Sequence, residues 1–289
     1  MNDPLPAGKD AIRWYHHLLA LPLRGLSATN VGPLGGENSI SAVIEAILAT
    51  QQGHSVDFPL SKTETFFVNT LTAPGHPPAD PLVEYRALNH AAQREVLRRW
   101  INKPLGVIWL GGGVFTLDHP LIATCKPDDW HIWTDANPKV VQAAQQMFDK
   151  MHHRAAHNNI AHNIILPQDI DKLNNIIYFL ADEGVEHIVI QAYGLFYVMT
   201  MKENFQWMSR LARPKGVEMS FIFNSLTKNV QLMPGVLAAF HHQRMVYYER
   251  SHIEALLREV VPGSEIVWSI PREQTQYGPE TWLIYARAP

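Results

Sequence analysis

The sequence predicts an α/β protein: a doubly wound sheet of seven mostly parallel strands, the last antiparallel, with an N-terminal helical cap. From about residue 103, short apolar segments alternate with helical ones, which is typical of a parallel sheet covered on both faces. Before that residue, apolar positions recur at three- and four-residue spacing, which indicates helices. The last two apolar segments leave no room for a helix between them, so we expect them to pair antiparallel.

The composition bounds the class of protein. With 289 residues, 46% of them hydrophobic, the chain can bury a substantial core. Its net charge is −3 and no Lys/Arg run stands out, so neither nucleic acid nor a membrane is an expected partner. Cys125 is the only cysteine, which excludes an intramolecular disulfide and a Cys-based zinc site. The first ten residues lack an apolar signal core, so we expect a cytoplasmic protein. We also expect that it binds no metal.

The segment before residue 103 reads as helices and one loop. Residues 11–23 and 39–53 carry helical periodicity. Residues 54–81 are rich in Pro, Thr and Gly and are expected to be loop. Residues 80–101 predict a long helix with Asp80 as its cap and Pro81 in its first turn.

The segment after residue 103 reads as alternating strands and helices. The expected strands are 106–111, 131–136, 162–167, 187–192, 217–224, 265–271 and 281–288. The expected helices between them are 118–124, 138–150, 170–183, 201–212 and 251–260.

Three consecutive glycines, Gly111, Gly112 and Gly113, follow the first expected strand. One glycine is enough for a strand-to-helix turn, so three predict bare backbone over the strand tip, where such sheets bind ligands. A P-loop is excluded because no Gly-Lys-Ser/Thr follows. A dinucleotide site fits poorly because Thr116 stands where the last glycine belongs. S-adenosylmethionine has no phosphate and needs only close approach of the backbone.

Polar residues end the next strands. Asp135 closes the second strand and is placed to accept both hydroxyls of a ribose, with Ala136 and Asn137 beside it; the alternative is a helix cap. Asp169 or Gln168 would lie near an adenine amino group, and a cap is again the alternative for Asp169. Gln191 lies at the tip of the fourth strand.

The segments LGGGVFTLDHPL, IWTDANPKVV, LPQDIDKL and QAYGLFYVMTMKENFQWMSRLARPKG resemble the class I S-adenosylmethionine-dependent methyltransferases, nearest the leucine-carboxyl-methyltransferase-like branch. The resemblance covers about residues 85–289. It implies that residues 1–103 form a cap and lid, and that residues 104–289 form the Rossmann-like catalytic domain that binds S-adenosylmethionine. It also implies that Arg86 holds the methionine carboxylate, with a plain surface arginine as the alternative.

The expected catalytic region is aromatic and lacks a base. Tyr193 and Tyr197 follow the fourth strand, and Tyr15 comes from the cap. Aromatic faces attract a sulfonium by cation–π interaction, although core packing is the competing explanation. We therefore expect a methyltransferase acting on a small molecule held under the cap.

Two alternatives stay open at this point. The first is a cyclase or lyase that consumes S-adenosylmethionine, similar to the azetidine-2-carboxylate synthases of natural product biosynthesis, or a related aminocarboxypropyl transfer. The second is a degenerate, binding-only relative, which the irregular glycine motif favours. The sequence leaves the oligomeric state open.

Overall fold

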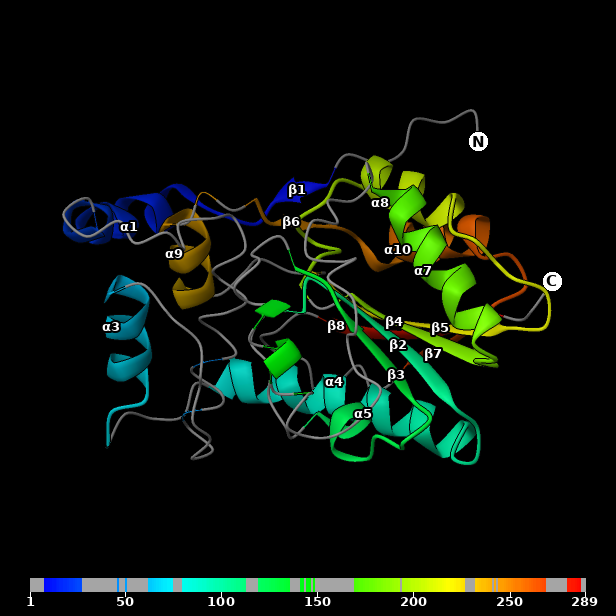
Figure 1. The fold of residues 1–289 in the computed structure, drawn as a ribbon. Helices are drawn as coiled ribbons and strands as arrows, with labels where there is room; N and C mark the ends of the chain where they lie inside the picture. The colour runs from blue at the N-terminus through cyan, green and yellow to red at the C-terminus, as the bar shows by residue number, and fades with distance from the viewer. Residues whose placement is uncertain are drawn as a thin grey trace.

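The computed structural model is shown in Figure 1. It describes residues 8–27, 46, 50, 62–74, 80–112, 119–135, 141–142, 144–146, 148, 169–192, 194–226, 232–240, 242, 244–268 and 280–286. Several predictions concern residues outside these ranges: the strand at 162–167, most of the helix at 39–53, and the site residues Gly113, Ala136, Asn137, Gln168 and Tyr193.

A six-stranded sheet forms the centre of the described fold. Its strands are β2 (Leu105–Leu110), β3 (Trp130–Trp133), β4 (His187–Ala192), β5 (Glu218–Ser225), β7 (Glu265–Trp268) and β8 (Glu280–Ala286). Their order is β3-β2-β4-β5-β8-β7; the first four are mutually parallel, and β8 is antiparallel to both of its neighbours. The prediction of a mostly parallel α/β sheet with an antiparallel strand at the chain's end is confirmed, and the seventh expected strand lies outside the described residues.

Helices cover both faces of this sheet, which is why most residues of its strands are buried and apolar (Figure 1). One face packs against α7 (Ile170–Asp182), α8 (Met201–Ser209) and α10 (Arg250–Val260). The other packs against α4 (Asp80–Arg99) and α5 (Pro120–Ala123). Alternate residues serve the two faces: Ile108 and Ile190 belong to the first core, Val107 and Val189 to the second.

The long helix α4 begins at the expected Asp80 and ends two residues before the expected position. Ala92 and Val96 in its carboxyl-terminal part, and Trp100 just after it, are buried against the sheet. Helix α4 thus packs on the sheet although it precedes the expected boundary near residue 103.

A second group of elements lies beside the sheet. It contains α1 (Trp14–Ser27), α3 (Lys62–Leu71), α9 (Leu232–Phe240) and a two-stranded sheet of β1 (Lys9–Asp10) with β6 (Val246–Tyr247). Helices α1 and α9 pack together around a buried cluster that includes Ala11, Ala20, Val236 and Ala239 (Figure 1). This second group is therefore built from the N-terminal segment together with the segment between β5 and α10.

Four of these elements correct the sequence-based expectation. Residues 54–81 were expected to be loop, and that was wrong over the ten residues of α3. Helix α9 and the β1–β6 pair were not predicted. Pro234 and Gly235 in α9 suggest a turn, but proline is tolerated in a helix's first turn, where its missing N–H has no partner to lose. None of the described helices has the length and hydropathy needed to cross a bilayer.

Candidate functional site

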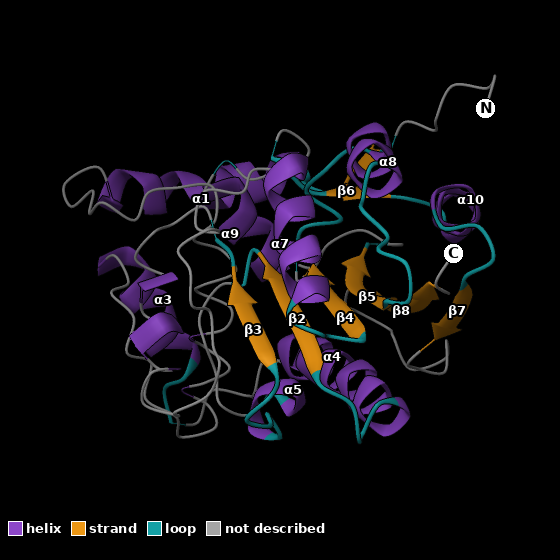
Figure 2. Ribbon diagram, turned by 45° about the vertical axis from the view of Figure 1, so that its right-hand side comes forward, coloured by secondary structure: helices purple, strands orange, loops and turns teal. Residues whose placement is uncertain are grey.

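The carboxyl ends of β2, β3 and β4 lie at one edge of the sheet, and Figure 2 shows their arrows pointing the same way. Trp109 pairs in register with Trp133 of β3 and with Gln191 of β4. The residues that follow these strands, Gly111 and Asp135, therefore come to the same edge as Gln191. The structure brings together these three predicted site residues.

Backbone conformation and contacts within the protein explain two of the glycines in the turn after β2. Gly111 has a φ of +57°, which favours glycine, and a Cβ there would lie 3.2 Å from Leu195. Gly112 donates its amide hydrogen to the carbonyl of Thr134, 2.8 Å away. A Cβ on Gly112 would lie 2.3 Å from the indole ring of Trp133. Two of the three glycines thus make room for the turn and for an indole, while Gly113 lies outside the described residues.

Replacing Gly112 with alanine should destabilise the fold, because the buried Trp133 ring cannot give way as a flexible side chain would. We expect a loss of about 1–3 kcal/mol in the free energy of unfolding, the usual cost of overpacking. Gly106→Ala in β2 is the matched control, since its Cβ would meet only the methyl groups of Leu180 and Val185, at 3.0 Å and beyond. Chemical denaturation of both variants checks this; equal losses would contradict the assigned role of Trp133.

Asp135 lies two residues beyond β3 and is 3% exposed. Its position is set by Thr134, whose amide and hydroxyl both donate to the carbonyl of Trp109 at 2.8 Å. A carboxylate that is buried in this way requires hydrogen-bond donors around it. The ribose role of Asp135 stays a prediction.

Gln191 takes part in a buried amide network on the α4 side of the sheet. Its Nε2 donates to Asn89 Oδ1 at 3.3 Å, and its Oε1 accepts from Gln93 Nε2 at 3.4 Å. Gln93 also accepts from the amide of Leu121 and lies 3.4 Å from His119 Nδ1. The network connects the tip of β4 to α4 and to the start of α5.

Asn89 and Gln93 were not predicted as site residues, although both are fully buried. Their four-residue spacing places both on one face of α4, and that spacing was the available signal. Because the described partners of the Gln191 amide lie on α4, its contact with a cofactor remains a prediction.

The predicted aromatic residues have different environments. Tyr197 is 6% exposed and belongs to the buried cluster between α1 and α9. Tyr15 is 37% exposed on α1, with its ring centroid 4.2 Å from that of His16. Phe196, next to Tyr197, stacks on Phe223 in the sheet core. The catalytic roles of Tyr15 and Tyr197 stay predictions.

Two polar predictions concern helix positions. Asp169 precedes α7 but makes no capping hydrogen bond through its side chain, and it pairs instead with Lys172 at 2.6 Å. Asp169 therefore occupies the N-cap position of α7 but does not cap the helix through its side chain. Arg86 lies within α4, and its side chain is outside the described part of the structure.

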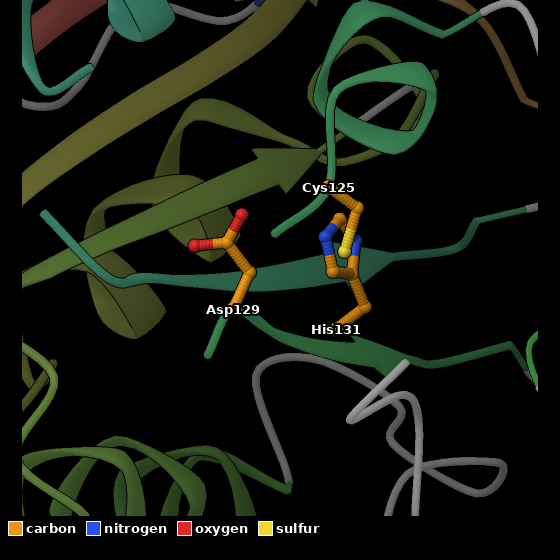
Figure 3. A group of neighbouring side chains, drawn as sticks. All are labelled: Cys125, Asp129 and His131. Carbon is orange, nitrogen blue, oxygen red and sulfur yellow. The ribbon is translucent and has the colours of Figure 1, made fainter. Parts of the chain in front are cut away.

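Cys125, Asp129 and His131 form a cluster at the opposite, amino end of β3 (Figure 3). Both Asp129 oxygens accept backbone amides at 2.8 Å, from Leu105 and Lys126. Trp109 Nε1 donates to His131 Nδ1 at 3.2 Å, so that nitrogen acts as an acceptor. Burial raises the pKa of the Cys125 thiol to about 12, which disfavours the thiolate that zinc requires. We assign the cluster a structural role in joining β2, β3 and the loop between them.

The comparisons with known proteins agree with this fold. No protein-family profile matches the sequence, and no curated protein matches it. A structure of a proposed methyltransferase from Thermobifida fusca is 16% identical, covering 86% of this chain and 94% of that chain at a TM-score of 0.51. A duf574 family protein from Streptomyces avermitilis is 12% identical, covering 86% and 97% at a TM-score of 0.53. At these identities the likeness shows the shared α/β fold and no more.

Proposed function

We propose that this chain binds S-adenosylmethionine at the carboxyl edge of β2 and β3 and transfers its methyl group to a small molecule. The observation that carries the proposal is Asp135, a buried carboxylate beside the glycine turn. It lies at the point where the sheet reverses its order, because β3 and β4 lie on either side of β2. Open α/β sheets bind ligands in the crevice at such a switch point. The fold likeness to a proposed methyltransferase supports the same function.

The described residues fit the ribose part of this ligand. Asp135 has two acceptor oxygens for the two hydroxyl groups, and Gly111 presents backbone without a side chain. When bound, the cofactor supplies a methyl group made electrophilic by its sulfonium. We also propose that Arg86 on α4 pairs with the methionine carboxylate, for which a guanidinium group has the right charge and geometry.

The acceptor is not expected to be activated by a base from the segment after β4. Residues 193–199 contain no carboxylate and no histidine, and three of the seven are aromatic. We propose that Tyr193 faces the sulfonium and that the rate comes mainly from orientation and exclusion of water. An acceptor that is nucleophilic without a base, such as a carboxylate or a neutral amine of a small metabolite, is the class that this arrangement fits.

The first experiment needs no knowledge of the acceptor. The purified protein is titrated with S-adenosylhomocysteine in a calorimeter, then incubated with S-adenosylmethionine alone, and its products are identified by mass spectrometry. Tight binding without turnover supports a methyltransferase that lacks its acceptor. Formation of methylthioadenosine with azetidine-2-carboxylate would replace methyl transfer by the cyclase reaction. Absence of binding to either nucleoside would overturn the proposed cofactor.

The acceptor class is tested next with methyl-labelled S-adenosylmethionine and a metabolite extract passed through a size filter. Label in the low-molecular-mass fraction supports the proposal. Label that appears only on protein would contradict a small-molecule acceptor. Persistent binding without any transfer would point to the binding-only alternative.

A further inference from the structure

Helix α1 has its large apolar side chains on the outside. Its face toward the protein carries His16 and Ala20, both fully buried. Its outer face carries Trp14, Leu18 and Leu21, which are 75%, 55% and 55% exposed. Surface helices of globular proteins normally have the opposite arrangement, with the apolar stripe toward the core.

The inner face of α1 is small and polar because α9 approaches it closely. A Cβ on Gly235 of α9 would lie 2.5 Å from His16 Nε2, so only glycine fits there. His16 Nδ1 accepts the amide of Arg13 at 2.9 Å and holds the start of the helix. Among the described residues, α1 thus packs on α9 through its inner face and leaves its outer face exposed.

The exposed apolar area of the described protein is concentrated on this helix. Of the eight large apolar side chains that the described residues expose, five belong to α1: Trp14, Tyr15, Leu18, Leu19 and Leu21. A concentration of this kind marks an interaction site rather than the scattered apolar residues of an ordinary surface. Of the other three, Phe66 lies on α3, Tyr178 lies on α7 and Ile101 follows α4.

The charges of α1 narrow the choice of partner. Residues 14–23 contain no Asp, Glu, Lys or Arg. A helix that lies on a membrane surface typically carries Lys and Arg on its polar face, so this composition fits a protein partner better. Arg24, which follows, donates to the carbonyl of Ala239 within the same chain. A second identical helix would therefore meet no like-charge repulsion along the stripe.

The spacing of Trp14, Leu18 and Leu21, the apolar stripe of α1, indicates that the protein partner is a second copy of this chain. Trp14 lies four residues before Leu18 and Leu21 lies three residues after it, so the stripe is nearly symmetric about Leu18. In an antiparallel pair about a two-fold axis, Leu18 faces its own copy and Trp14 faces Leu21 of the partner subunit. Two-fold interfaces require self-complementarity of this kind.

We propose that two copies of this chain associate through the outer faces of their α1 helices, paired antiparallel about a two-fold axis at Leu18. A pair of fourteen-residue helices is smaller than a standard interface of about 1,600 Å². The dimer is therefore a reversible one that dissociates on dilution. This inference does not depend on the proposed cofactor.

Sedimentation velocity over a range of protein concentrations tests the association. The unaltered chain is expected to shift from monomer to dimer as its concentration rises, while Leu18→Asp stays monomeric. Tyr178→Asp on α7 is the matched control, since Tyr178 is 53% exposed and its variant should dimerise like the unaltered chain. Circular dichroism verifies that both variants fold. A monomer at every concentration, or a dimer that Leu18→Asp leaves intact, would overturn the proposal.

Disulfide trapping tests the two-fold geometry separately. The single variant Leu18→Cys should form covalent dimers with itself, because each cysteine faces its copy in the partner subunit. This test remains valid if Leu18→Asp fails to fold. Trp14→Cys and Leu21→Cys should form them efficiently only when the two variants are mixed. Cys125 is half-buried, so the unaltered chain should not cross-link. Efficient trapping of Leu21→Cys with itself, or sedimentation of a monomer with phosphatidylserine vesicles, would contradict the antiparallel dimer.

Discussion

Replacing Asp135 with asparagine should weaken binding of S-adenosylhomocysteine by about ten- to a hundredfold. The side chain keeps its size but loses its charge and one of its two acceptor oxygens, and a hydrogen bond to a charged group contributes about 1.5–3 kcal/mol. Asp135 is 3% exposed, so water cannot easily replace the lost interaction. Calorimetric titration measures the change in the dissociation constant.

Asp171→Asn is the matched control for this experiment. It removes the same charge from a side chain that is 85% exposed on the first turn of α7, so affinity should not change. Thermal unfolding verifies that both variants fold. Unchanged affinity in Asp135→Asn would remove the ribose assignment while leaving the cofactor in place, whereas no binding by the unaltered chain would remove the proposed function itself.

Acidification should destabilise the protein through His187, the first residue of β4. The ring is fully buried, stacks on Trp100 at a centroid distance of 3.7 Å and lies 2.8 Å from the Ser220 hydroxyl. Burial, with smaller contributions from Arg99 and Lys103, lowers the pKa of His187 to about 3. The unfolded chain has the ordinary histidine pKa of about 6.5, so between these values it binds a proton that the folded chain does not.

The sign of the effect follows from that difference. Stability is fully present above about pH 6.5 and is lost as the pH falls toward 3, by about 1.4 kcal/mol per pH unit for this residue. Burial also lowers the pKa of His16, which acts in the same direction. Urea unfolding at a series of pH values measures the slope.

His187→Gln provides the decisive comparison. Glutamine can keep a hydrogen bond to Ser220 but does not titrate, so we expect lower stability at pH 7.5 and a flatter decline below pH 6. His252→Gln on α10 is the control for a histidine-to-glutamine change outside the buried core. An unaltered slope in His187→Gln would show that acid destabilisation comes from other groups.

The sheet was predictable because each of its strands is recognisable locally. Parallel strands that are buried on both faces are continuous apolar runs, and β2 and β4 were found within a residue of their bounds for that reason. Helix α4 was bounded by Asp80 and Pro81, whose backbone preferences act over one turn. Asp135 was identified because a polar residue at the end of such a strand is also a local feature.

The contacts that require glycine at positions 112 and 235 could not be predicted from local sequence. Gly112 lacks a side chain because the Trp133 indole occupies the space, and Trp133 comes from a neighbouring strand twenty-one residues along the chain. Helix α9 was missed because Pro234 and Gly235 indicate a turn when read locally. Gly235 is explained only by its contact with His16, which lies more than two hundred residues away.

The sequence by itself determined the fold class, the bounds of the central elements and the carboxylate at the strand edge, because these depend on residues close together along the chain. The tertiary structure alone decided which side of α1 faces the protein. Periodicity predicted a helix there, and its stripe of Trp14, Leu18 and Leu21 would ordinarily be assigned to the core. Close approach requires small side chains, so the His16 and Ala20 face packed against α9 and the apolar stripe was left outside.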